Sequence, residues 1–166
     1  GFKSAGWDPY YKPDAPLNSA DVVNLGYILN VIEDTEERII CLKKAWELAG
    51  KVLIVAAQVL VNAPSSKNQV AYGDGVVTSR NTFQKYYEQA ELKKYIDRTL
   101  EVASIPICLG IYLVFRSEEE KENFRAEWYY SRVIAPRIRL ATKRFEDCQE
   151  ELEPLMKFYT KRGRLP

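Results

Sequence analysis

The pattern of apolar and polar positions predicts a strand, a helix and a second strand in the first third of the chain. Residues 21–25 carry adjacent valines, as strands do, and residues 35–49 repeat apolar side chains at helical spacing. Asp34 and Glu37 form a capping-box pattern at the start of the helix, and Gly50 is expected to end it. Residues 51–60 are almost continuously apolar, which indicates a strand buried on both faces. This order predicts a βαβ unit in a parallel sheet.

The remaining elements follow from turn residues and spacing. Residues 2–7 are expected to form a short strand that ends at Asp8-Pro9, and prolines then exclude regular structure through Leu17. The polar stretch 62–79 is long enough to predict a lid or binding loop. Residues 83–96 predict one or two helices, and residues 102–114 predict two strands that fold back at Leu109-Gly110.

Helices are predicted for the last third of the chain. Ser117, with Glu120 three residues later, is expected to start a helical region that Pro136 and Pro154 interrupt or kink. We therefore expect one α/β domain over residues 1–116 and a C-terminal helical extension over residues 117–166.

Composition and charge fit an ordinary soluble protein. The chain has 46% hydrophobic residues and a net charge of +1, which argues neither for nor against a nucleic-acid partner. The longest apolar run is too short to span a membrane, and the first residues lack the apolar segment of a signal peptide. The three cysteines, Cys41, Cys108 and Cys148, are widely spaced and are expected to be reduced thiols of a cytoplasmic protein.

The chain contains no histidine, which excludes several kinds of chemistry. Ser-His-Asp hydrolysis, Cys-His proteolysis and histidine-ligated metals all require it, so we expect no metal site. Chemistry must depend on other side chains or on a cofactor.

Two predicted strand ends carry polar groups where ligands bind in open parallel sheets. Asp8 has a carboxylate that can accept hydrogen bonds from both hydroxyls of a ribose, although an Asp-Pro turn alone would also explain it. Asn24-Leu25-Gly26-Tyr27 follows the second predicted strand. Its amide, glycine and aromatic ring can serve a ligand, but a tight turn before the helix explains it as well.

Three phrases occurring in order resemble a known family. They are GWDPYYKPDAPLNSADVVNLGYILNVIED, GDGVVTSRNTFQKYY and GIYLVFRSEEE, within residues 6–124. They resemble the methyltransferases associated with bacterial DNA phosphorothioation systems, which are class I S-adenosylmethionine-dependent enzymes. The resemblance implies a Rossmann-like methyltransferase sheet, mostly parallel, with a C-terminal antiparallel hairpin. It implies Asp8 as the ribose ligand, and Asn24, Leu25, Gly26, Tyr27 and Asn30 beside the methionine end of the cofactor or the substrate.

The sequence departs from this family pattern in two ways. The glycine-rich phrase of the first strand, which would precede Gly1, does not occur, and only residues 9–20 separate Asp8 from the next predicted strand. We therefore expect a fragment, incomplete at the N-terminus, that is inactive alone although its parent protein is a methyltransferase.

The methyl acceptor is left open by the sequence. NLGY resembles the Asn-Pro-Pro-Tyr motif of DNA amino-methyltransferases, but Leu-Gly lacks the rigidity of Pro-Pro, so base flipping is the less favoured interpretation. Ser79, Arg80, Gln84 and Lys85 form a candidate substrate-binding flank, with a surface loop before a helix as the alternative. A basic segment from Arg125 to Arg144 can meet DNA or another nucleic acid, or can form a solvated helical surface.

Two functions remain at the level of sequence. The first is a methyltransferase linked to bacterial DNA modification and defence, because methyl transfer needs positioning rather than histidine chemistry. The second is a Rossmann-like module that has lost the cofactor and serves as an interaction or nucleic-acid-docking part.

Overall fold

A computed structural model of the chain describes residues 3–60, 69–134 and 149–162. The chain divides into two compact units, Gly1–Arg125 and Ala126–Pro166. The division falls inside helix α3 (Glu118–Ile134), whereas the boundary predicted from the sequence lies just before this helix.

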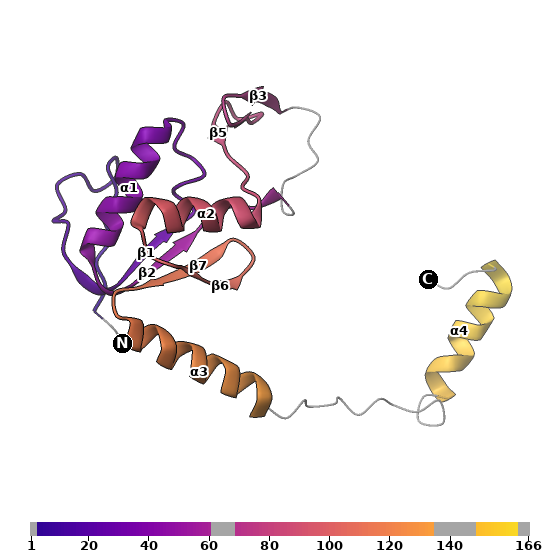
Figure 1. The fold of residues 1–166 in the computed structure, drawn as a ribbon. Helices are drawn as coiled ribbons and strands as arrows, with labels where there is room; N and C mark the ends of the chain where they lie inside the picture. The colour runs from indigo at the N-terminus through magenta and orange to yellow at the C-terminus, as the bar shows by residue number, and fades with distance from the viewer. Residues whose placement is uncertain (1–2, 61–68, 135–148, 163–166) are drawn as a thin grey trace. The chain divides into compact units, whose positions relative to one another are not determined.

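The first unit is built on a four-stranded mixed sheet (Figure 1). Its strands lie in the order β1 (Ala20–Gly26), β2 (Ala49–Ala56), β7 (Ile111–Phe115) and β6 (Ile105–Cys108). β1 and β2 are parallel and are joined by helix α1 (Thr35–Leu48), which confirms the predicted βαβ unit. β7 runs antiparallel to both β2 and β6, which confirms the predicted antiparallel pair around Gly110. The expectation of a mostly parallel sheet was wrong, since only one of the three strand pairings of this sheet is parallel.

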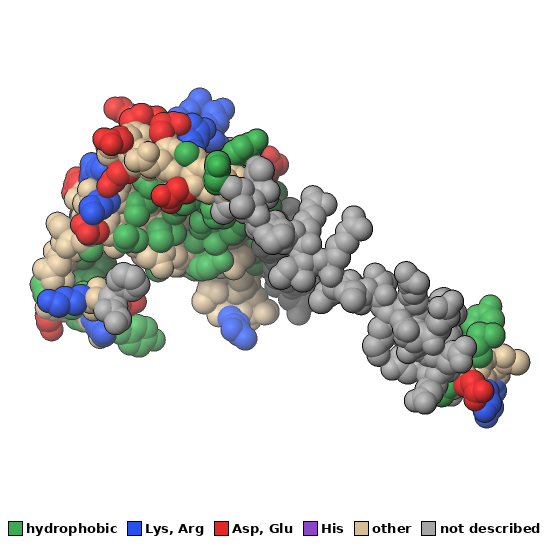
Figure 2. Space-filling view, turned by 90° about the horizontal axis from the view of Figure 1, so that it is seen from below, with side chains coloured by type: hydrophobic (Ala, Val, Ile, Leu, Met, Phe, Trp, Pro, Cys, Tyr) green, Lys and Arg blue, Asp and Glu red, His purple; other side chains and the backbone are tan. Residues whose placement is uncertain are grey.

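One face of this sheet is covered by α1 and by α2 (Gln89–Leu100), as Figure 1 shows. Side chains that share this face on three strands are buried against the two helices: Leu25, Leu53, Val55, Tyr112 and Val114 from the strands, and Leu42, Leu92 and Ile96 from the helices. The opposite face is less covered, since Val22 is 53% exposed and Val52 and Ile54 are half-buried. Figure 2 shows hydrophobic side chains at the surface of this unit.

A second, smaller sheet replaces part of the predicted polar loop. β3 (Val70–Tyr72), β4 (Gly75–Val77) and β5 (Phe83–Gln84) pair antiparallel in that order. The prediction of helix from residue 83 was wrong, since Phe83 and Gln84 form a strand. The start signal for α2 lies at Glu88, whose N–H donates to the Glu91 carboxylate at 3.1 Å. Residues 61–68 lie outside the described part of the chain.

Two predictions near the N-terminus and at the end of α1 were wrong. Residues 3–7 form no strand, because no neighbouring strand pairs with them, and Phe2 lies outside the described residues. Gly50 does not cap α1: the helix ends at Leu48, and Ala49 already has extended φ and ψ of −78° and 113°. A Cβ at Gly50 would lie 3.3 Å from the Ala20 carbonyl oxygen, so this glycine allows β1 and β2 to approach closely.

The starts of α1 and α3 agree with the sequence. Asp34 accepts a hydrogen bond from the Glu37 N–H at 2.8 Å, and Ser117 accepts one from the Glu120 N–H at 3.4 Å. Pro154 lies inside α4 (Gln149–Arg162) and does not end it, while Pro136 lies outside the described residues. Cys41 and Cys108 are free thiols; Cys148 lies outside the described residues. Among the described helices, none has the length and apolar character to cross a membrane.

Replacing Gly110 with alanine is expected to lower the free energy of unfolding by more than the same change at Gly73. Both glycines have positive φ, 71° and 53°, so both changes cost about 1–2 kcal/mol of backbone strain. A Cβ at Gly110 would also lie 2.3 Å from the Ala57 carbonyl oxygen, whereas one at Gly73 meets nothing within 4 Å. Urea denaturation of the two variants measures the difference, and equal losses would show that the β6–β7 turn yields to the clash.

Candidate functional site

The candidate site lies at the carboxyl ends of the two parallel strands. Gly26 is paired with Ala56, and the Tyr27 N–H donates to the Ala56 carbonyl at 2.7 Å. Asn24 and Gly26 project from the face of β1 opposite to the core, because strand side chains alternate. A Cβ at Gly26 would lie 3.2 Å from Asn24 Oδ1, so the glycine leaves room for this amide. Asn24 is exposed and therefore offers a donor and an acceptor at the strand end.

Tyr27 begins the loop after β1 in an unusual conformation. Its φ is 59°, in the left-handed region, and its side chain is 49% exposed. A bulky side chain is uncommon there, and a glycine stands immediately before it in the sequence. Residues in such sparsely populated backbone regions cluster at active sites and ligand-binding segments. Leu25, by contrast, is only 9% exposed and packs in the core, so only its backbone can contribute to a site.

Asn30 contributes a buried and unsatisfied acceptor to the same loop. The residue is 2% exposed, and its Oδ1 accepts no hydrogen bond from the described residues. An acceptor left unpaired in a protein interior costs about 1–3 kcal/mol. Its main-chain carbonyl is satisfied, since it accepts the Lys85 N–H at 2.7 Å. A small opening of the loop would present Oδ1 to a donor.

A buried arginine holds the other end of this loop. The guanidinium of Arg38, on α1, donates to the main-chain carbonyls of Ile32 at 2.7 Å and Glu33 at 2.8 Å. It also makes a bidentate pair with Asp74, at 2.6 and 2.7 Å. This pair lowers the pKa of the Asp74 carboxyl to about 2, chiefly through the hydrogen bonds from Arg38. The same pair raises the pKa of Arg38.

Lys85 extends this ion cluster and is not available at the surface. Its side chain is 9% exposed, and its ammonium lies 3.1 Å from Asp74 Oδ2 and 2.8 Å from Glu91 Oε1. Burial lowers the pKa of Lys85, but hydrogen bonds to Glu91 and Asp74 outweigh it, so the net pKa is raised. The sequence placed Lys85 in a substrate-binding flank; in the structure its charge is taken up by these two carboxylates.

The other residues of that predicted flank lie on the small sheet. Ser79 and Arg80 are exposed at the tip of the β4–β5 connection, where the Thr78 N–H donates to the Thr82 carbonyl at 2.9 Å. Gln84 is half-buried in β5. Lys85 thus belongs to the ion cluster, while Ser79 and Arg80 form an exposed hairpin tip.

Asp8 lies in a local turn rather than at the end of a strand. Its Oδ1 accepts the N–H groups of Tyr10 at 2.8 Å and Tyr11 at 2.7 Å. The sequence left such an Asp-Pro turn open as the alternative to a ribose site. The turn uses one of the two carboxylate oxygens of Asp8. From the two predicted strand ends, Asp8 and Gly26 are expected to lie close together at one edge of the sheet, and this stays a prediction.

The sequence analysis did not predict the ion pair between Arg38 and Asp74. A signal for Arg38 existed: it falls on the same helical face as Leu42 and Ala45, both buried, where a charged residue requires a partner. Asp74 stands between two glycines in a turn and gave no such signal.

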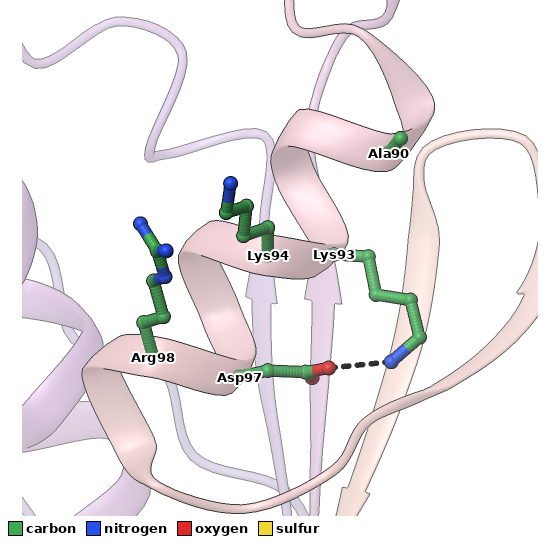
Figure 3. A pocket seen from close by; sticks show the side chains of 5 residues that line it. All are labelled: Ala90, Lys93, Lys94, Asp97 and Arg98. Atoms are coloured by element: carbon green, nitrogen blue, oxygen red, sulfur yellow. Dashed lines mark hydrogen bonds and ion pairs between the residues drawn. The ribbon is translucent and has the colours of Figure 1, made fainter.

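The exposed side of α2 carries an open hollow of about 360 Å³ lined by Ala90, Lys93, Lys94, Asp97 and Arg98. Figure 3 shows Lys93 paired with Asp97, while Lys94 and Arg98 lie on the helix surface beside them. Asp97 also accepts hydrogen bonds from Ser104, so it ties α2 to the segment before β6. Of the predicted basic segment, Arg125 is paired with Glu122, and residues 137–144 lie outside the described residues.

No group of three metal-ligating side chains occurs within the described residues. No family model, curated protein or solved structure matches the chain. The candidate site is therefore defined by its geometry alone.

Lowering the pH from 4 to 2 is expected to loosen the attachment of the β3–β4 turn to α1. The folded-state pKa of Asp74 is about 2, below its usual value of 3.8, so its stabilisation is complete above pH 4 and disappears as pH falls toward 2. Asp74→Asn removes this titration. The urea midpoints of both proteins are measured at pH 5 and at pH 2.5, and the midpoint of the unaltered protein is expected to fall further than that of Asp74→Asn. An equal fall in both proteins would contradict this prediction.

Proposed function

We propose that the chain is part of an S-adenosylmethionine-dependent methyltransferase linked to bacterial DNA modification and defence, with its site at the carboxyl ends of β1 and β2. The observation that carries the proposal is the position of Asn24, Gly26 and Tyr27. They stand at the end of a parallel strand pair, where α/β sheets bind ligands, and the sheet continues into the antiparallel hairpin expected of this family.

The polar groups at this edge fit the methionine end of the cofactor. That end carries an ammonium and a carboxylate, and an exposed amide such as Asn24 can donate to one or accept from the other. Asn30 Oδ1, an acceptor without a partner among the described residues, suits an ammonium donor once the loop opens. The free carboxylate oxygen of Asp8 can accept from a ribose hydroxyl.

Methyl transfer requires mainly that the methyl donor and the methyl acceptor are aligned. The sulfonium of S-adenosylmethionine supplies an already activated methyl group. The residues of this chain would bind the methionine end and, through the exposed ring of Tyr27, flank the methyl acceptor. Such positioning fits a chain without histidine.

The hydrogen bonds that Asp8 makes within its own turn favour a second function, that of a non-catalytic interaction or nucleic-acid-docking module. Its Oδ1 is engaged by two backbone N–H groups, and a carboxylate that only shapes a turn needs no cofactor.

Cofactor binding distinguishes the two functions. We expect a polypeptide that includes the sequence encoded upstream of Gly1 to bind S-adenosylmethionine in calorimetric titration. Asn24→Ala is expected to weaken binding about tenfold or more, since a hydrogen bond to a charged group contributes about 1.5–3 kcal/mol. Asp21→Ala is the matched control, because Asp21 is exposed on the same strand but at its amino end. An extended protein without measurable affinity would favour the docking module.

A further inference from the structure

The ion cluster around Arg38 joins two parts of the chain that are distant in sequence. Arg38 donates to carbonyls of the loop that follows β1, and it donates on its other edge to Asp74, in the turn between β3 and β4. A guanidinium has five N–H donors in one rigid plane, so its orientation toward the loop is set by what the opposite edge binds.

We propose that Asp74 is a positioning residue for the candidate site, acting through Arg38 on the loop that carries Tyr27 and Asn30. The inference rests on the proposed function, since it concerns the same site. Asp74 contacts neither Tyr27 nor Asn30 by any hydrogen bond of the described residues. Its bidentate bond orients Arg38, and Arg38 in turn fixes the carbonyls of Ile32 and Glu33.

Burial makes this linkage rigid. The Arg38 side chain is 3% exposed, and its guanidinium carbon lies 5.6 Å from the centre of the Phe83 ring on β5. Released from Asp74, the cation would sit in a poorly solvated place with unsatisfied donors, and it would have to move. The loop carbonyls bonded to it would then lose their anchor.

A second set of contacts ties the small sheet to the same loop. The Lys85 N–H donates to the Asn30 carbonyl at 2.7 Å, and the Lys85 ammonium contacts the Asp74 carboxylate at 3.1 Å. Hydrogen bonding to Glu33 and the charge of that carboxylate raise the pKa of the Tyr72 phenol on β3. The Lys85–Asn30 hydrogen bond therefore joins the small sheet to the loop, and Asp74 contacts both Arg38 and Lys85.

The linkage predicts how a change in the β3–β4 turn reaches the site. Asp74→Asn keeps the size of the side chain but removes its charge and one of the two acceptors that Arg38 uses. In hydrogen exchange of this chain, we expect the amide of Val31, which bonds to the Ile28 carbonyl, to exchange at least tenfold faster. The amide of Ala57, bonded to the Gly110 carbonyl in the main sheet, is expected to keep its rate.

Glu118→Gln is the matched control. This change also removes the carboxylate partner of a largely buried cation, Lys121, whose side chain is 11% exposed. Among the described residues, the Glu118–Lys121 pair has no hydrogen bond to the loop. Glu118→Gln should therefore leave Val31 unchanged. Equal acceleration of Val31 and Ala57 in Asp74→Asn would indicate general destabilisation, and acceleration confined to residues 70–77 would indicate a local effect. Either result would overturn the positioning role.

The consequence for binding separates this inference from the proposed function. In a polypeptide that includes the upstream sequence, Asp74→Asn should weaken S-adenosylmethionine at least tenfold, and Glu118→Gln should not. If the unaltered protein binds and Asp74→Asn binds equally well, the positioning role fails while the proposed function stands. If the unaltered protein does not bind, the proposed function fails and the role assigned to Asp74 in it fails as well.

Discussion

Replacing Arg38 with alanine is expected to lower the free energy of unfolding by about 2–6 kcal/mol, since each of two loop carbonyls left without a donor costs about 1–3 kcal/mol. The change removes hydrogen bonds to Ile32, Glu33 and Asp74 at once and leaves two loop carbonyls without donors. Because Asp74 is 40% exposed, water can solvate its freed carboxylate, so most of the loss should come from the carbonyls and the vacated space.

Arg116 offers a matched control for this experiment. It also donates to two main-chain carbonyls, those of Ala49 and Trp46, and it stacks on the Trp46 ring at 3.7 Å. It is exposed and has no carboxylate partner among the described residues, so Arg116→Ala should cost about 1–2 kcal/mol. Urea unfolding of both variants gives the comparison, and a loss at Arg38 no larger than at Arg116 would show that the ion cluster adds little stability.

The main sheet could be predicted from the sequence because its signals are local. The valines of β1, the Asp34 cap and the apolar run of β2 each specify one element, and their order specifies the parallel pair. Gly110 between two apolar runs likewise specified the hairpin. Boundaries were less certain: Gly50 suggested a helix end, but it serves the close approach of two strands.

The ion cluster could not be predicted because its members meet only after folding. Arg38 and Asp74 are separated by 36 residues, and a charged residue in a helix does not reveal which carboxylate will satisfy it. Lys85 illustrates the error that follows. In the sequence it suggested part of a substrate-binding flank, whereas tertiary packing buries it between Asp74 and Glu91.

The small sheet was missed for a related reason. Phe83, Tyr86 and Tyr87 fit a helical face, but two-residue strands such as β5 leave no periodic pattern. At the candidate site, the sequence identified the strand end at Asn24 to Tyr27, which the structure places at the edge of the parallel pair. The left-handed backbone of Tyr27 and the unsatisfied Asn30 oxygen depend on the loop path and had no sequence signal.

The chain alone is expected to bind S-adenosylmethionine weakly or not at all, whereas a polypeptide that adds the upstream sequence should bind it. By the resemblance, a glycine-rich loop runs under the cofactor, and the printed residues contain no such phrase. One ribose contact to Asp8 supplies about 1.5–3 kcal/mol, and micromolar affinity requires about 8 kcal/mol. Asn24 and Asn30 can add hydrogen bonds of similar size, but Asn30 must first be uncovered by opening the loop. Asp8 and Asn24 together supply about 3–6 kcal/mol, which falls short of the value for micromolar binding while Asn30 stays buried.

The edge of β1 provides an independent test of the same account. β1 ends the strand order of the main sheet, and Val22 on it is 53% exposed, so its outer edge is open among the described residues. Open strand edges pair with other chains, and we expect this chain to associate with increasing concentration in light scattering. Val22→Lys should reduce the association without changing the core, because charged side chains on an edge strand oppose pairing. Micromolar affinity of the short chain in calorimetric titration would show that the site is complete without the glycine-rich loop.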